Sequence, residues 1–511
     1  MEKTEKKLLP IAIFAAFVTV VLIFIFAINC NINLQAETIT SDCTLSLSDA
    51  NGNTKWLDSK RLLDDEYTTY TTLSKGDILK IKSDKQIAGL YIVWNKIPGE
   101  WNLTINEKSF SAGKHGFLHE YLSIEELYAS TSNEVSIVMP KDISVCDIYV
   151  FSQGELPGWV QVWQPSCEKA DIMLLSTHSD DEQLFFAGLL PYYAGEVGAA
   201  VQVVYLTNHW DTQNRPHEQI NGLWTVGVKN YPVVGHFPDD VDTLKRDGET
   251  VEQTLRRVLK GDYDSSGTWG EDALIKFQVE MIRRFKPQVV VAHDVNGEYQ
   301  HGAHIANTYT LQQALEPAAD STKYSESAVL YGTWNVPKVY IHLWKENKII
   351  MDWDKPLENF GGKTAFEVSK EGYKCHRSQQ WTWFTRWLTG TSDGQRDTIT
   401  KASEIKTYSP CEFGLYRTLV GVDTKADLVD NITLYKDQYV PEETPSEPTA
   451  SNTPTPDNSE STPTADGGEI SNKGQDDDKN EADVEEILIY CAMAACIIAI
   501  LIMAMVSAKK K

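Results

Sequence analysis

The chain has 511 residues with 47 basic and 72 acidic side chains, which gives a formal net charge of −25. This length exceeds that of one ordinary domain, and an apolar share of 42% excludes a chain that is disordered throughout. The acidic balance argues against non-specific nucleic-acid binding, because phosphate contacts need a basic surface. We therefore expect at least two folded domains and no nucleic-acid partner.

Uncharged apolar runs lie near both ends of the chain. Residues 8–28 follow three lysines and residues 487–508 precede three lysines, and each run is about long enough to span a ~30 Å hydrocarbon core. Because basic residues stay on the cytoplasmic side, we expect residues 29–486 to lie outside, with the protein in the cell membrane. The first run is equally well interpreted as a signal peptide that is cut near Ala36. The lipid bilayer is thus a predicted partner, through one or two transmembrane helices.

Short strands dominate residues 37–165. Runs such as 87–94 and 146–152 are rich in β-branched and aromatic residues and alternate with turn residues, while helical periodicity is nearly absent. This rhythm predicts a β-sandwich. The pattern resembles the galactose-binding-like jelly rolls often appended to extracellular carbohydrate enzymes, although the residues themselves carry no sugar-binding motif.

Strands and helices alternate in the next part, a domain predicted to span residues 168–435. Buried strands are expected at 171–176, 201–207, 231–237 and 288–293, and helices at 183–194, 215–228, 271–285 and 302–315. Continuous apolar strands between helices predict a Rossmann-like α/β fold, with a mostly parallel sheet covered on both faces. Ligands of such sheets bind beyond the carboxyl ends of the strands.

Two loops at such strand ends are rich in titratable residues. His178 and Asp181 follow the first strand and are three residues apart at a helix start, so their side chains can point to one place. His301 and His304 have the same spacing after strand 288–293. Alone, the first loop is an acidic helix cap and the second a surface histidine pair. Together they supply the nitrogen and carboxylate ligands of a zinc site that keeps one position open for water.

Residues 441–486 differ sharply in composition from the folded part. They contain 14 acidic and 2 basic residues, many Pro, Thr and Ser, and almost no large apolar side chain. Such a segment cannot bury enough surface to offset its chain entropy, so we expect an extended stalk.

The two loops resemble the signatures of the PIG-L/LmbE-like N-acetylglucosamine de-N-acetylases. That family has an HPDDE-type loop, an R-x-x-E helix and a later D-x-N-G-x-Y-x-H-x-D-H loop. This chain has HSDDE at 178–182, RPHE at 215–218 and DVNGEYQHGAH at 294–304, and residues 375–379 are similar to a further family element. The resemblance implies a zinc-dependent enzyme that removes acetyl from N-acetylglucosamine-type sugars. With the predicted membrane helices, the expected substrate is an extracellular glycan or glycolipid.

The resemblance also implies roles for individual residues. The implied ligands of zinc, or of another divalent transition metal, are His178, Asp181 and His304. The implied catalytic residues are Asp180 as general base, His301 as general acid or stabiliser of a charged intermediate, and Tyr299 as an oxyanion contact. The implied or suggested substrate-binding residues are Arg215, Trp210 and His376.

Some of these residues have a plainer interpretation. Arg215 with Glu218 is equally well an ordinary helical ion pair. Trp381, Trp383 and Trp387 are expected in the core, whereas Trp210 lies in a loop at the sheet edge of the metal site, where it can stack on a sugar.

Two positions depart from the family pattern. Ser179 stands where the family has Pro, which should be tolerated, and Ala303 stands where it has Asp between the two histidines. Loss of that Asp is expected to change the proton affinity of His301 and to lower activity. Two alternatives therefore remain: a membrane-tethered carbohydrate-binding or adhesion protein with a weakened site, and a hydrolase of another amide, such as a thiol conjugate.

Overall fold

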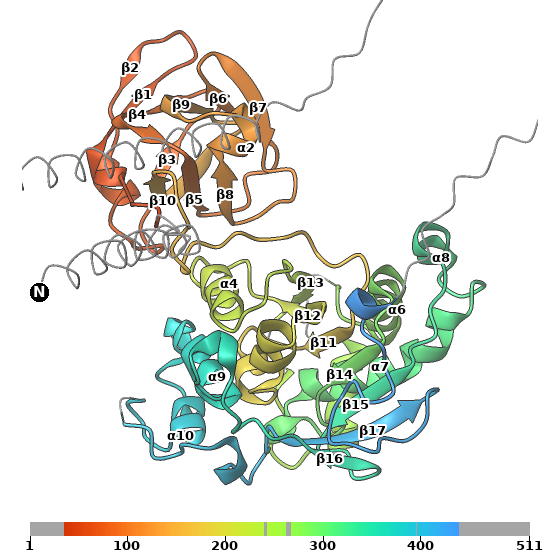
Figure 1. Cartoon of the computed structure of the whole chain (residues 1–511). Helices are drawn as coiled ribbons and strands as arrows, with labels where there is room; N and C mark the ends of the chain where they lie inside the picture. Colours follow the sequence, from red (N-terminus) through yellow and green to blue (C-terminus); the bar gives the residue numbers. More distant parts are fainter. Residues whose placement is uncertain (1–34, 240–242, 262–266, 395, 439–511) are drawn as a thin grey trace, which may run out of the picture. The chain divides into compact units, whose positions relative to one another are not determined.

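The computed structural model of the protein describes residues 35–438, apart from residues 240–242, 262–266 and 395 (Figure 1). This part of the chain contains a β-sandwich, followed by an α/β domain with a seven-stranded sheet.

Two antiparallel sheets form the sandwich. The first has the order β2-β1-β4-β9-β6-β7 and the second the order β3-β10-β5-β8. The strands are β1 (Cys43–Ser48), β2 (Thr54–Lys55), β3 (Thr71–Leu73), β4 (Ile78–Ile87), β5 (Gly89–Trp94), β6 (Trp101–Ile105), β7 (Lys108–Ala112), β8 (His119–Ser123), β9 (Ser132–Val138) and β10 (Ile143–Phe151), and the short helix α2 (Ile124–Tyr128) follows β8. Alternation decides which face is buried: Leu79 and Ile81 of β4 are fully buried and pair with Ile137 and Val135 of β9, whereas Lys80 and Lys82 between and beside them are exposed.

The sheet of the α/β domain has the order β13-β12-β11-β14-β15-β17-β16. Its strands are β11 (Ile172–Ser176), β12 (Val201–Asn208), β13 (Val233–Pro238), β14 (Val289–Ala292), β15 (Lys338–His342), β16 (Lys348–Ile350) and β17 (Glu412–Thr418). The first five strands in this order are parallel, and β17 and β16 add an antiparallel edge. The expectation of a mostly parallel sheet thus describes the part that carries the two histidine loops.

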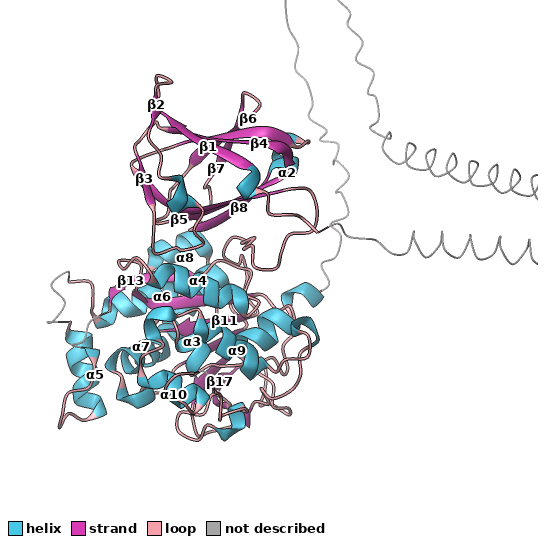
Figure 2. Ribbon diagram, turned by 90° about the vertical axis from the view of Figure 1, so that its left-hand side faces the viewer, coloured by secondary structure: helices cyan, strands magenta, loops and turns pink. Residues whose placement is uncertain are grey.

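Helices cover both faces of this sheet (Figure 2). Odd and even residues of the buried strands enter different cores: Ile172 and Leu174 pack with α4 and α9, and Met173 and Leu175 pack with α6 and α7. The helices are α3 (Asp181–Leu184), α4 (Arg215–Thr225), α5 (Val251–Lys260), α6 (Glu271–Phe285), α7 (Gly302–Ala319), α8 (Ser325–Tyr331), α9 (Ala365–Lys374) and α10 (Trp383–Thr389). Burial on both faces explains why the strands read as continuous apolar runs.

The continuous helix expected at 183–194 is wrong. Helix α3 ends at Leu184, a turn follows, and a π-helix occupies Pro191–Glu196. The break is at Gly188, whose φ of +101° suits glycine and whose position leaves no space for a Cβ, which would lie 2.3 Å from Cγ of Trp353. Packing against a tryptophan distant in sequence therefore overrides the local helical pattern.

The predicted transmembrane helices and the membrane location require correction. Of the helices in the described part of the chain, none is both long enough and apolar enough to cross a bilayer. Residues 8–28 and 487–508, where such helices were expected, lie outside the described residues, as does the expected stalk at 441–486. The fold class of the described residues is therefore an α/β domain preceded by a β-sandwich, and the assignment to the extracellular side of a cell membrane is withdrawn.

A buried histidine pair joins the sandwich to helix α4. His119 Nε2 on β8 lies 2.8 Å from His217 Nδ1 on α4, and His119 Nδ1 lies 3.1 Å from the Gln161 side-chain oxygen. Because that oxygen is an acceptor, Nδ1 of His119 carries a proton, and its Nε2 accepts the proton of His217. Both rings are thus neutral, and burial lowers the pKa of His217 to about 3.

This pair predicts a loss of stability in acid. The pKa of His217 is below its ordinary 6.5, so its contribution is fully present above pH 6.5 and is lost as pH falls toward 3, because the unfolded chain takes up the proton first. His217→Asn keeps a donor near Nδ1 but cannot titrate. Between pH 6 and 4, we expect the free energy of unfolding, measured in urea, to fall less steeply in this variant, by up to about 1.4 kcal/mol per pH unit. Identical slopes in the two proteins would contradict the assignment.

Candidate functional site

The two histidine loops meet because their strands are neighbours. Strands β11 and β14 pair in parallel, so the loops that follow them leave the same edge of the sheet. His178 comes two residues after β11, and His304 lies in the first turn of α7, after β14. Asp180 has a φ of +130°, a conformation that costs a non-glycine residue energy and that is found mostly at functional sites.

Three side-chain atoms from these loops converge. His178 Nδ1 lies 3.0 Å from His304 Nε2 and 3.2 Å from Asp181 Oδ2, and the distance from His304 Nε2 to Asp181 Oδ2 is 3.3 Å. Ligands at zinc–ligand distances of 2.0–2.1 Å in a tetrahedron are about 3.3 Å apart. All three residues are buried. The donor triangle, as we call these three atoms, therefore fits a zinc ion with one position left for water.

Two other histidines lie close to the triangle but are less suited as ligands. His293 donates from Nδ1 to Glu298 (2.8 Å) and accepts at Nε2 from the Thr177 backbone N–H (3.0 Å), so both of its nitrogens are in use. His301 accepts the backbone N–H of Ala303 at Nδ1 and keeps its Nε2 proton. The sequence-predicted set of His178, Asp181 and His304 stays the best ligand hypothesis.

The electrostatics of the triangle favour a cation. Burial alone would lower the pKa of His178, but Asp181 and Asp239 outweigh it and raise that pKa to about 10. Burial would also raise the pKa of Asp181, yet His304 and His178 hold it well below its ordinary value. The site thus keeps a carboxylate ionised in a buried place and attracts positive charge.

Glu298 organises the site from behind. Its carboxylate is fully buried and bonds three imidazole Nδ1 atoms, at 2.7 Å for His304, 2.8 Å for His293 and 2.6 Å for His342. The bond to His304 places that ring's proton on Nδ1, so Nε2 presents a lone pair to the donor triangle. A carboxylate in this position fixes both the tautomer and the orientation of a metal-binding histidine.

His342 is a further partner of Glu298. Its Nδ1 faces the Glu298 carboxylate, and its Nε2 lies 2.8 Å from the backbone oxygen of Ser409. The His342 ring thus connects the Glu298 carboxylate to the backbone at Ser409. A buried carboxylate is tolerated when it is paired and fully hydrogen-bonded in this way.

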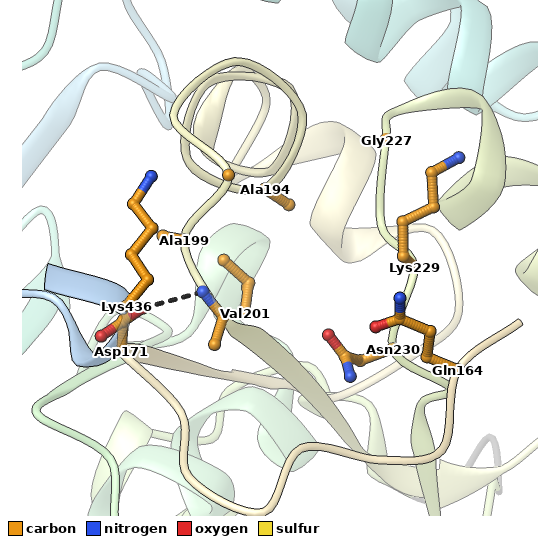
Figure 3. Close-up of a pocket in the computed structure, with 11 residues that line it drawn as sticks. Gln164, Asp171, Ala194, Ala199, Val201, Gly227, Lys229, Asn230 and Lys436 are labelled. Atoms are coloured by element: carbon orange, nitrogen blue, oxygen red, sulfur yellow. Dashed lines mark hydrogen bonds between the residues drawn. The ribbon is translucent and has the colours of Figure 1, made fainter. Parts of the chain in front are cut away.

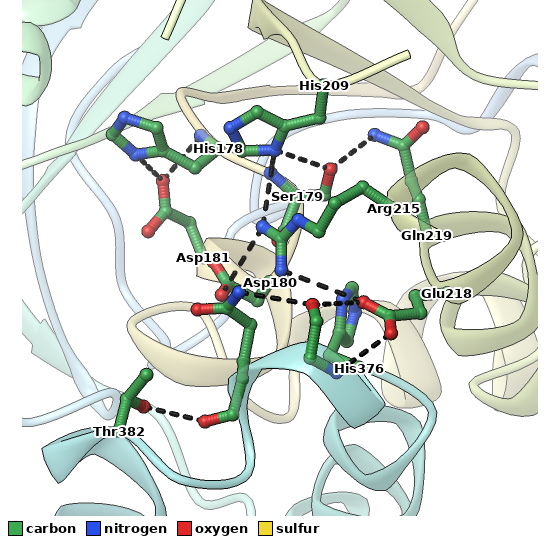
Figure 4. A network of polar contacts seen from close by, with 12 residues as sticks. His178, Ser179, Asp180, Asp181, His209, Arg215, Glu218, Gln219, His376 and Thr382 are labelled. Atoms are coloured by element: carbon green, nitrogen blue, oxygen red, sulfur yellow. Dashed lines mark hydrogen bonds and ion pairs between the residues drawn. The ribbon is translucent and has the colours of Figure 1, made fainter. Parts of the chain in front are cut away.

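Arg215 joins the first loop to helix α4 (Figure 4). Its Nη2 donates to the backbone oxygen of Ser179, and the same atom lies 3.2 Å from His209 Nδ1 and 3.6 Å from Asp180 Oδ2. The nearest Glu218 oxygen is farther, at 3.9 Å. The structure thus shows Arg215 bonded to the loop that carries Asp180, with Glu218 only a more distant partner, and its contact with a substrate stays a prediction.

Tyr299 and His301 lie against the donor triangle. The Tyr299 ring is 5.3 Å from the His301 ring and 5.5 Å from the His304 ring, and the His301 ring is 4.6 Å from that of His178. Burial, together with Asp181 and Asp180, raises the pKa of Tyr299 well above its ordinary value, so its hydroxyl keeps its proton and can donate.

The two remaining substrate candidates occupy different surroundings. Trp210 is half-buried, and its indole N–H donates to Gln219, which in turn reaches Ser179. His376 is fully buried, with Nε2 3.5 Å from Glu182 and not in the donor triangle. The structure brings together His178, Asp180, Asp181, Tyr299, His301, His304 and Arg215, and leaves Trp210 and His376 beyond them.

Sequence reasoning assigned no role to several residues of the site. His209 and Asp239 form a 2.8 Å contact behind His178, and His342 ends a strand, β15, that was not predicted. Glu298 stood inside the recognised loop, so an acid between two histidine positions was a usable signal. Burial lowers the pKa of His209 to about 4, which makes it a neutral bridge between Asp239 and Arg215.

A cavity elsewhere in the domain does not belong to this site. It has a volume of about 290 Å³ and is lined by residues that precede β11 and β12, together with Lys229 and Lys436 (Figure 3). Its acid, Asp171, is occupied by the backbone N–H groups of Ala200 and Tyr435. The cavity is at the amino ends of the strands, whereas the donor triangle is at the carboxyl ends.

Comparison with known proteins shows which family part of the α/β domain resembles. Residues 173–315 match the family of GlcNAc-PI de-N-acetylases, PIG-L. In this sense we call the domain that contains them PIG-L-like. A 1D-myo-inositol 2-acetamido-2-deoxy-alpha-D-glucopyranoside deacetylase 2 of Saccharopolyspora erythraea is 31% identical over 191 residues, which are 33% of this chain and 63% of that protein. The mycothiol S-conjugate amidase of Streptomyces coelicolor is 48% identical over 63 residues, 12% of this chain and 21% of the amidase.

The chain thus spans less than two thirds of the length of these curated relatives. Among solved structures, N,N'-diacetylchitobiose deacetylase from Pyrococcus horikoshii aligns with 48% of this chain and 84% of its own, with a TM-score of 0.33 and 14% identity.

The position of Glu298 predicts that this residue strengthens metal binding. Glu298→Gln removes the negative charge of the carboxylate that holds His304 and replaces one of its two acceptor oxygens by an amide group. We therefore expect zinc affinity to fall about 10- to 100-fold. Competition with a coloured chelator measures that affinity. The matched control is Glu326→Gln, because Glu326 is exposed and pairs with Lys276 at the surface. Equal zinc affinity of the two variants would contradict the role of Glu298.

Proposed function

We propose that the PIG-L-like domain is a zinc-dependent hydrolase that removes the acetyl group from an N-acetylglucosamine-type sugar. The observation that carries this proposal is the donor triangle of His178, Asp181 and His304, with Asp180 beside it and outside it. A zinc ion bound there supplies a Lewis acid, which makes a water molecule acidic near neutral pH and polarises an amide carbonyl. The match of residues 173–315 to the GlcNAc-PI de-N-acetylase family and the names of the relatives support the same reaction.

Asp180 is the proposed general base. It directly precedes the ligand Asp181, but its side chain is turned toward Arg215 instead of joining the triangle (Figure 4). A carboxylate that borders the metal without binding it can accept the proton of an attacking water. The guanidinium of Arg215 keeps this carboxylate in place and offsets the repulsion from Asp181.

Tyr299 and His301 are the proposed partners of the reacting amide. The Tyr299 hydroxyl donates to the oxygen on which negative charge develops, and such donors are worth most in a buried site. His301 carries its proton on Nε2, because Nδ1 accepts the Ala303 N–H, and can donate a hydrogen bond from Nε2 that stabilises the charged intermediate. Trp210 and His376 remain proposed substrate contacts.

A second candidate is hydrolysis of a different amide. The short match to a mycothiol S-conjugate amidase covers a stretch in which sequence identity is 48%. A metal held by the donor triangle would act on an amide bond whatever group carries that amide. Both reactions would therefore use the same residues. A substrate panel that contains N-acetylglucosamine oligomers, an N-acetylglucosaminyl-inositol and a thiol-conjugate amide separates them.

Asp180→Asn tests the proposed mechanism. We expect acetate release to fall about 10²- to 10⁴-fold, while bound zinc stays at the wild-type level, because Asp180 is not a ligand. Acetate is measured by a coupled assay and zinc by elemental analysis of the same samples.

Asp352→Asn is the control for this variant. Asp352 is an exposed acid that pairs with Lys355, so its loss should leave acetate release unchanged. Full activity of Asp180→Asn, or acetate release that survives removal of the metal by a chelator, would rule out the mechanism.

A further inference from the structure

Two tryptophans near the site are exposed, contrary to the expectation that they lie in the core. Trp381 is 83% exposed and Trp383 is 48% exposed. Trp387, the third tryptophan of this segment, does pack inward, since its indole N–H donates to the backbone oxygen of Thr407 and its ring lies 5.4 Å from Phe185. Two large aromatic rings exposed two residues apart form an apolar surface that a ligand can cover.

These rings continue from the proposed reaction site. The Trp383 ring lies edge-on to Tyr299 at 5.7 Å and 4.3 Å from Phe384, and Tyr299 in turn contacts His301 and His304. A molecule that reacts at the donor triangle and extends past Tyr299 therefore reaches Trp383, and Trp381 precedes Trp383 by two residues in the chain.

The indole N–H groups of these rings are available to a ligand. Several other tryptophans donate theirs to the protein, as Trp210 does to Gln219, Trp224 to Gly158 and Trp353 to Pro410. Within the described residues, neither Trp381 nor Trp383 has a hydrogen-bond partner for its indole nitrogen. Each ring thus offers an apolar face beside an unused donor.

We propose that Trp381 and Trp383 form a platform for a second sugar ring, so that the substrate is an oligosaccharide of amino sugars longer than one residue. The inference rests on the proposed function of the metal site. A pyranose has an apolar face of C–H groups, which stacks on an indole, and a rim of hydroxyls, which accept from its N–H. With the reacting sugar beside Tyr299, the neighbouring sugar covers Trp383 and the next one covers Trp381.

Binding of sugars of two lengths tests the platform without relying on turnover. The probes are N-acetylglucosamine and its β-1,4-linked trimer, titrated by calorimetry into the full chain. One aromatic contact of this kind is worth up to about tenfold in affinity, and the trimer can make two of them. We therefore expect the trimer to bind the wild-type protein about tenfold more tightly than the monomer, or more. Trp383→Ala and Trp381→Ala should reduce that preference, and Trp383→Phe should restore most of it.

The control variant is Trp56→Ala. Trp56 is also 83% exposed but lies at the end of β2 in the sandwich, so its loss should leave the preference for the trimer intact. Equal affinity of the wild-type protein for both probes would overturn the platform. A preference for the trimer that survives the double variant Trp381→Ala/Trp383→Ala would overturn it as well.

Acetate release separates failure of the platform from failure of the proposed function. If the trimer binds through Trp383 but no acetate is released, the platform stands and the deacetylase proposal falls. If acetate is released from the trimer with the same length preference in the double variant, the deacetylase stands and the platform falls. Unchanged circular dichroism and melting temperature of the alanine variants confirm that loss of binding is not loss of fold.

Discussion

The site depends on the approach of three electron-pair donors to within 3.3 Å of one another in a buried place. With neither a proton nor a metal cation between them, His178 Nδ1, Asp181 Oδ2 and His304 Nε2 would repel each other. The two loops that carry these residues are about 120 residues apart in the sequence. They are held in this arrangement because β11 and β14 are parallel neighbours. The fold thus creates a place whose chemistry only a positive charge completes.

The residues around the donor triangle hold its ligands in position. Glu298 orients His304 and also contacts His342, whose other ring nitrogen lies against the backbone oxygen of Ser409. On the other side, Asp239 and His209 border His178, and Arg215 fixes the loop that carries Asp180. Each buried charge therefore has a partner, which makes the positions of the ligands rigid.

Much of the α/β domain could be read from the sequence, and its exceptions have physical causes. Long apolar strands and the helix at Glu271–Phe285 were predicted with nearly their observed bounds, because burial on two faces and a single apolar stripe leave clear patterns. The helix expected at 183–194 failed because Gly188 packs on Trp353, a contact that no local pattern records. The antiparallel edge strands β16 and β17 were missed because they are defined by pairing with each other and with β15.

The same division holds for the site. The ligand hypothesis needed only two loops at strand ends, whereas the roles of Glu298 and His342 depend on the distance between residues from different strands. Trp381 and Trp383 show the limit most clearly, since aromatic residues at the start of a short helix are normally core and only the structure reveals that they are exposed.

Anomalous scattering at the zinc absorption edge, measured on crystals of the full chain, locates a bound zinc ion. We expect a peak bound by His178 Nδ1, Asp181 Oδ2 and His304 Nε2 at distances of about 2.0–2.2 Å. A peak ligated instead by His293 or His301 without Asp181, or no zinc peak in this part of the map, would contradict this ligand set.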